Sequence, residues 1–120
     1  MNMSEHTWLD LLSYFWGGIF LANAIPHFVS GMMGRAHQTP FAKPPGQGLS
    51  SSMVNVLWGF FNIVVGYVLV CHVGDFNLKD TRDVAAFGAG TLLIALMSAW
   101  GFGRFNGGNP PGGNGKSKGV

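Results

Sequence analysis

Polar side chains inside two long uncharged stretches of the sequence are the first candidates for chemistry. Asn23 and His27 are four residues apart, so they share one face of a helix. In the second stretch, polar and small residues recur at helical spacing and form one stripe: Asn55, Gly59, Asn62 and Gly66. Small residues let membrane helices approach closely, and Asn side chains hydrogen-bond between them. The spacing therefore predicts that the stripe packs on the face of Asn23 and His27. The alternative is a polar pathway or ligand site along the same residues.

Known catalytic patterns are absent from the sequence. It contains no G-x-S-x-G, no H-E-x-x-H, no metal-ligand cluster and no paired carboxylates. Proton-coupled transport usually requires a carboxylate within the membrane, and here it would have to depend on His27. We therefore expect no enzyme activity, no catalytic residue, no metal and no cofactor.

Two histidines in apolar stretches could in principle both bind the iron of one haem. His27 and His72 lie past the middle of two stretches that run in opposite directions through the membrane. At 1.5 Å per helical residue, their depths differ by about 20 Å. One haem iron cannot bind both, although a site with a single histidine, or one shared between subunits, stays open.

Three stretches must position these side chains, and none of them contains a charged residue. The chain has 120 residues, with seven Lys and Arg and five Asp and Glu, and all of these fall outside residues 11–33, 53–74 and 84–102. A hydrocarbon core of about 30 Å requires about 20 helical residues. A helix of a soluble bundle would show a polar face, and these stretches show none. The sequence predicts an all-α integral membrane protein, with residues 1–105 forming a domain of three transmembrane helices.

The distribution of basic residues predicts an orientation. With three spans, the N-terminus and the second loop share one side, which carries only Lys79 and Arg82. The other side carries the remaining five: Arg35, Lys43, Arg104, Lys116 and Lys118. Because basic residues stay on the cytoplasmic side, we expect the N-terminus outside and the C-terminus inside. A net charge of +2 without a basic stripe argues against nucleic acid as a partner.

The connecting segments have distinct compositions. Residues 34–52 are rich in Pro and Gly, which predicts a structured, non-helical connection and leaves open whether it binds a ligand. Ser51 or Ser52 is suited to cap the second helix, and Asp80, Thr81 or Asp83 to cap the third. Residues 106–120 contain mainly Gly, Asn and Pro, and we expect them to be disordered. Cys71 is the single cysteine, so an internal disulfide is impossible.

Three segments carry a resemblance to other proteins. The runs NAIPHF (23–28), PFAKPPGQG (40–48) and NVLWGFFN (55–62) resemble uncharacterised small multi-pass bacterial membrane proteins, over about Trp16–Gly66. This resemblance implies a place in the bacterial plasma membrane. It implies no activity, cofactor or partner.

Three small helices bury little surface by themselves, which favours association with further copies or with a larger membrane complex. We therefore expect a non-enzymatic integral membrane protein that acts as an accessory or assembly component. The alternative is a small homo-oligomeric transporter or channel with a polar path near Asn23, His27, Asn55 and Asn62.

Overall fold

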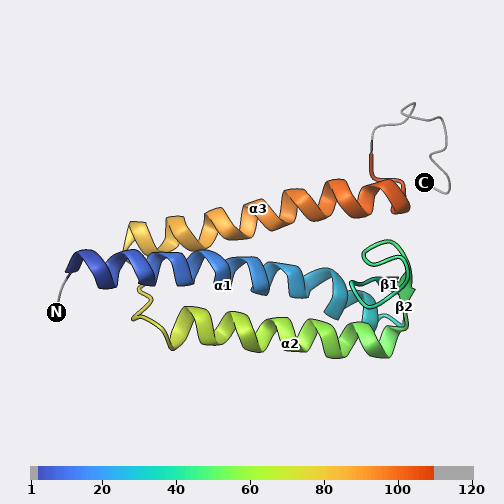
Figure 1. Cartoon of the computed structure of the whole chain (residues 1–120), viewed down its shortest axis with the longest axis horizontal. Helices are drawn as coiled ribbons and strands as arrows, with labels where there is room; N and C mark the ends of the chain where they lie inside the picture. The colour runs from blue at the N-terminus through green and yellow to red at the C-terminus, as the bar shows by residue number, and fades with distance from the viewer. Residues whose placement is uncertain (1–2, 110–120) are drawn as a thin grey trace.

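Three helices make up most of the chain in the computed structural model, which describes residues 3–109. Helix α1 covers Met3–Met32, α2 covers Ser52–Cys71 and α3 covers Thr81–Asn106. α1 lies in the middle, and both α2 and α3 pack along it (Figure 1). Each helix is long and apolar enough to cross a membrane. The prediction of three helices able to span a bilayer is therefore confirmed.

The distribution of buried and exposed residues is the reverse of that in a soluble protein. Asn55, Asn62 and His27 are at most 2% exposed, whereas Leu57 is 65% and Leu96 is 61% exposed. A soluble chain would hide its large apolar residues and expose its amides. Lipid as the surrounding solvent accounts for the opposite arrangement, because apolar side chains meet hydrocarbon and polar ones meet each other.

Close contact with α1 depends on glycine on both sides of that helix. A side-chain carbon at Gly17 would overlap a valine side chain of α2, and one at Gly18 would overlap the backbone carbonyl oxygen of Phe87 in α3. On α3, a carbon at Gly90 would overlap the carbonyl oxygen of Phe15. Adjacent glycines on α1 therefore let a helix backbone approach from each side.

The ends of α1 and α2 differ from the predicted spans. α1 begins at Met3 and not at residue 11. The apolar pattern marks only the part of a helix that lies in the membrane, whereas the backbone hydrogen bonds of α1 extend beyond that part. α2 begins after Ser51, a predicted cap, whose hydroxyl accepts from the Val54 N–H at 3.2 Å. It ends at Cys71 and not at residue 74, because the chain turns at His72 toward the next helix.

α3 is longer at both ends than the predicted span 84–102. Asp80, one of the predicted caps, accepts the Arg82 N–H at 2.9 Å and starts the helix at Thr81. The helix continues to Asn106, where Gly107 adopts φ 78° and ends it. Side-chain caps and a left-handed glycine act on the backbone, so they extend a helix beyond its apolar stretch. The predicted disordered tail therefore loses its first residue to α3, and residues 110–120 lie outside the described residues.

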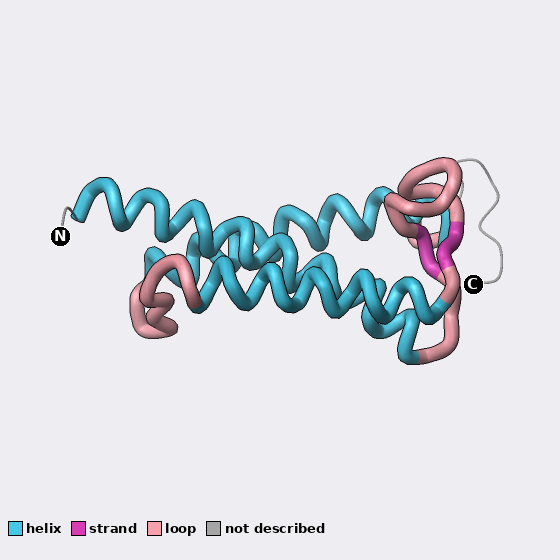
Figure 2. Tube along the Cα trace, turned by 60° about the horizontal axis from the view of Figure 1, so that its bottom comes forward, coloured by secondary structure: helices cyan, strands magenta, loops and turns pink. Residues whose placement is uncertain are grey.

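The connection between α1 and α2 contains two short strands that the sequence pattern does not predict. β1 (His37–Gln38) pairs antiparallel with β2 (Leu49–Ser50), as Figure 2 shows at one end of the molecule. The Thr39 and Ser50 hydroxyls hydrogen-bond at 2.5 Å and hold the two sides together. Two-residue strands leave no periodicity to read, which is why the sequence reveals only a non-helical connection.

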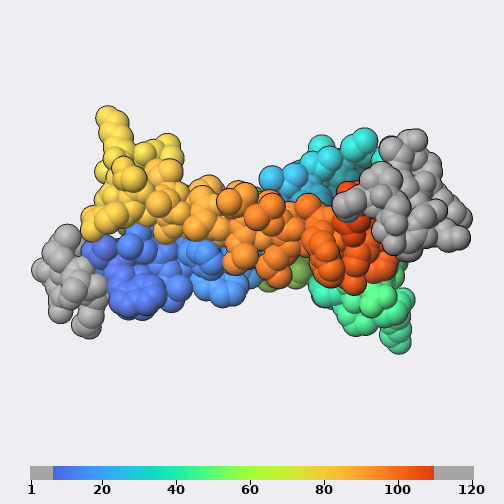
Figure 3. Space-filling view, turned by 90° about the horizontal axis from the view of Figure 1, so that it is seen from above, coloured from blue at the N-terminus to red at the C-terminus, as the bar shows by residue number. Residues whose placement is uncertain are grey.

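The two ends of the molecule carry different segments. The loop between α2 and α3 lies beside the start of α1 at one end, and the β1–β2 connection lies near the end of α3 at the other (Figure 3). We call the end with the start of α1 the N-terminal end, and the end with the β1–β2 connection the loop end.

Candidate functional site: the polar seam between α1 and α2

Asn23, His27, Asn55 and Asn62, which we call the polar seam, face one another between α1 and α2. The Asn23 amide donates to Asn62 Oδ1 at 3.1 Å. His27 Nδ1 and Asn55 Oδ1 are 2.8 Å apart. The structure thus brings all four predicted polar residues together as two pairs.

Asn55 is the residue with the most hydrogen-bond partners in the seam. Its Nδ2 lies 3.2 Å from the His37 carbonyl oxygen, 3.1 Å from that of Ser50 and 3.0 Å from that of Ser51. Carbonyl oxygens only accept hydrogen bonds, so the amide atom that faces these three carbonyls is the nitrogen. The amide atom that faces His27 is therefore Oδ1. Since Oδ1 must accept, His27 carries its proton on Nδ1. One buried amide therefore ties α1, the β1–β2 connection and the start of α2 together.

The remaining predicted residues, Gly59 and Gly66, provide the close approach that these bonds require. A side-chain carbon at Gly59 would lie 2.7 Å from the Phe28 backbone nitrogen. One at Gly66 would overlap the Leu21 side chain and lie 3.1 Å from the Gly17 carbonyl oxygen. Both glycines face α1, on the same side of α2 as Asn55 and Asn62.

We expect the substitution Asn62→Leu to lower the free energy of unfolding in detergent by about 1 kcal/mol. The leucine removes the bond from Asn23 and the 2.8 Å bond to the Trp58 carbonyl oxygen. Thermal melting of the purified protein measures the change, with Leu57→Ala, on a 65% exposed position of the same helix, as the control. Equal melting temperatures for Asn62→Leu and the unsubstituted protein would contradict a packing role.

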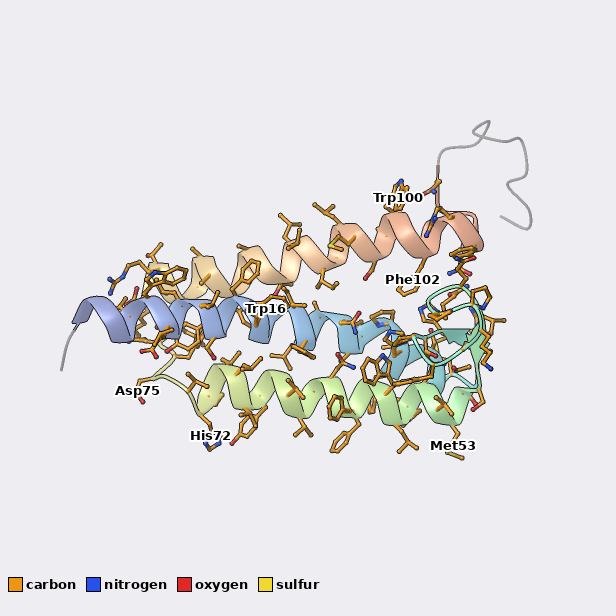
Figure 4. The ribbon with its side chains drawn as sticks, in the orientation of Figure 1. Trp16, Met53, His72, Asp75, Trp100 and Phe102 are labelled. Carbon is orange, nitrogen blue, oxygen red and sulfur yellow. The ribbon has the colours of Figure 1, made fainter. Side chains whose placement is uncertain are left out.

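Aromatic side chains surround the seam at the loop end. The His27 ring centroid lies 5.2 Å from that of His37, 6.1 Å from Phe102 and 6.4 Å from Trp58. Phe102 reaches this cluster from α3, and Figure 4 shows it pointing toward the other two helices. Phe41 packs edge-on against Trp58 at 4.8 Å, which explains a tryptophan so far inside an apolar stretch. Burial, followed by the nearby His27, lowers the pKa of His37 from its usual value near 6.5.

Unused hydrogen-bonding capacity is concentrated at the same end. Within the described part of the chain, three buried atoms have no hydrogen-bond partner: His37 Nε2, Gln38 Oε1 and Trp58 Nε1. The sequence offers no periodic signal for His37 or Gln38, because both lie in the irregular connection. The seam side chains themselves are taken up by mutual bonds.

Comparison with known proteins adds no relative to this description. No protein-family model, no curated protein and no solved structure matches the chain. What the site can do is therefore argued from its geometry.

The geometry restricts the chemistry of the site. His27 contacts Asn55 in the first turns of α2, whereas His72 caps the opposite end, about 25 Å away along the helix. The two histidines therefore cannot bind one haem iron. In residues 7–109, no group of three or more His, Cys, Asp or Glu side chains is placed to hold a metal ion. The arrangement is suited to joining helices and anchoring the connection between them.

Proposed function

We propose that this chain is a non-enzymatic integral membrane protein that serves as an accessory or assembly component of a larger membrane complex. The observation that carries the proposal is the position of α3, which packs mainly on α1 and is exposed along most of its length. Its outer face presents small residues, among them Gly88, Ala95 and Ala99, which are exposed. Small residues on a lipid-facing surface favour the approach of another transmembrane helix.

The substitution Gly88→Leu tests this face without disturbing the chain itself. A side-chain carbon at Gly88 meets nothing within 4 Å, and neither does one at Gly101, which points elsewhere on α3. We expect Gly88→Leu to abolish co-purification with a partner after solubilisation in mild detergent, and Gly101→Leu to leave it intact. Mass spectrometry of the purified material identifies what stays attached. A chain that purifies alone from its native membrane, or one that carries only copies of itself, would contradict the proposal.

The second candidate is a small homo-oligomeric transporter or channel lined by the polar seam. Such a path needs side chains that can exchange their partners for water or substrate. In the single chain, Asn55 and Asn62 are at most 1% exposed, and their amides are bonded to His27, to Asn23 and to backbone carbonyls. This closed geometry favours the accessory role.

For the orientation, we propose that the N-terminal end faces outward across a bacterial plasma membrane. The support is the set of basic residues at the loop end, where Arg35, Lys43 and Arg104 are all exposed. Retention of such residues on the cytoplasmic side would place this end inside.

Cys71 provides a natural test of this orientation, because it is the single cysteine, is exposed and ends α2 at the N-terminal end. We expect a membrane-impermeant maleimide to label it in intact spheroplasts. Its counterpart is the double variant Cys71→Ser/Ala36→Cys, with the thiol at the loop end, which should react only after permeabilisation. The reverse pattern would place the N-terminus inside.

A further inference from the structure

A polar cavity at the N-terminal end lies apart from the seam. It has a volume of about 400 Å³ and lies between the start of α1, the end of α2 and the loop before α3. Figure 4 labels His72 and Asp75 at this end. The volume falls within the range of about 300–1,000 Å³ typical of small-molecule sites.

Negative charge dominates the lining of this cavity. Four carboxylates line it, those of Asp10, Asp75, Asp80 and Asp83. Arg82 is the one Lys or Arg side chain in the lining. Arg82 pairs with Asp80 at 3.3 Å, and its hydrogen bonds lower the pKa of that carboxyl. Asp83 accepts the Asn77 N–H at 3.0 Å and has no salt bridge to a Lys or Arg of residues 7–109. Three carboxylates therefore face the cavity without an ion-pair partner among residues 7–109.

A buried phenol points to the same space. Tyr14 lines the cavity and is 1% exposed, and its hydroxyl lies beside Gly74, another lining residue. A side-chain carbon at Gly74 would overlap this hydroxyl and lie 2.8 Å from Asp10 Oδ1. Gly74 does not have a positive φ, so the backbone does not require glycine there. Its lack of a side chain leaves open the point where the phenol and the carboxylate converge.

The donor set fits an organic cation better than a metal ion. A metal requires several ligand atoms within about 2.0–2.6 Å of one point, and no described group of three such side chains is so placed. Dispersed carboxylates around a space of this size instead match ammonium groups separated by a flexible chain, each of which donates up to three hydrogen bonds. We propose that this cavity binds a small organic cation with primary ammonium groups, of the diamine or polyamine class.

Isothermal titration of the full chain in nanodiscs of neutral lipid tests this site, with spermidine as the probe and empty nanodiscs as the blank. We expect saturable binding that weakens about tenfold in Asp75→Asn, a loss of about 1.4 kcal/mol, because the variant lacks one charge-assisted hydrogen bond at an exposed position. Asp75 is exposed, so this variant should fold normally. Tyr14→Phe keeps the ring packed and should weaken binding severalfold.

Two controls define the outcome. Lys79→Gln changes the charge of the same loop but does not line the cavity, and it should not weaken binding. Magnesium chloride at equal ionic strength should give no saturable heat. Binding of spermidine that is the same in Asp75→Asn and Tyr14→Phe as in the unsubstituted chain would overturn the proposal. So would the absence of saturable binding, or equal binding of magnesium.

Discussion

Replacing Gly90 by leucine should separate α3 from α1 and lower the free energy of unfolding by about 3 kcal/mol. The reason is geometric, because even the first side-chain carbon would overlap the backbone carbonyl oxygen of Phe15 and lie 2.9 Å from its carbonyl carbon. A backbone atom cannot turn aside as a side chain can, so the helices must move apart. Overpacking of this kind costs about 1–3 kcal/mol, and a backbone collision belongs at the upper end.

The matched control for this change is two residues away. At Gly88 the first side-chain carbon meets nothing within 4 Å, and we expect Gly88→Leu to have an unfolding free energy close to that of the unsubstituted chain. Denaturant unfolding in detergent micelles, followed by tryptophan fluorescence, compares the two variants directly. Equal losses in Gly88→Leu and Gly90→Leu would mean that α3 does not pack on α1 through the face that contains Gly90.

Replacing Asn55 by leucine should also cost about 3 kcal/mol, well above the loss expected for Asn62→Leu. The substitution leaves His27 Nδ1–H without its acceptor and removes the donor shared by three backbone carbonyls. Each buried polar group left without a partner costs about 1–3 kcal/mol. We further expect faster amide hydrogen exchange in the β1–β2 connection, because the Asn55 amide holds the carbonyl of His37.

A double variant separates the hydrogen bond from general damage. In His27→Leu/Asn55→Leu both partners of the 2.8 Å contact are gone, so the combined loss should be smaller than the sum of the two single losses. Strictly additive losses, or an Asn55→Leu loss no larger than that of Asn62→Leu, would contradict the central position of Asn55 in the seam.

The sequence predicts the helices well because the membrane simplifies the pattern. A span must be long, apolar and free of charge, and these properties can be read locally from residues 11–33, 53–74 and 84–102. One face of α2 could also be predicted from spacing, that of Asn55, Gly59, Asn62 and Gly66. In the structure this face packs against α1. Helix ends are harder, because caps such as Asp80 and Gly107 operate outside the apolar stretch.

Features that depend on distant parts of the chain could not be read from the sequence. The role of Asn55 requires the carbonyls of His37 and Ser50 to return to its side chain, and no local pattern specifies the path of that connection. The close contact on α3 is made by Gly90, while a side-chain carbon at Gly88, only two residues away, would meet nothing within 4 Å. The acidic cavity likewise forms only when the start of α1 meets the loop before α3.

Collision measurements on spin labels test most directly whether lipid surrounds these helices. In a Cys71→Ser background, nitroxides are attached at Leu93→Cys and Leu96→Cys near the middle of α3, and at Leu78→Cys in the loop before it, where the native side chain is 80% exposed. In bilayers we expect the two α3 labels to collide mainly with oxygen, which concentrates in hydrocarbon, and the loop label mainly with a water-soluble nickel chelate. Nickel collisions at Leu93 and Leu96 as frequent as those at Leu78 would show that water surrounds α3, and the membrane-spanning architecture would be wrong.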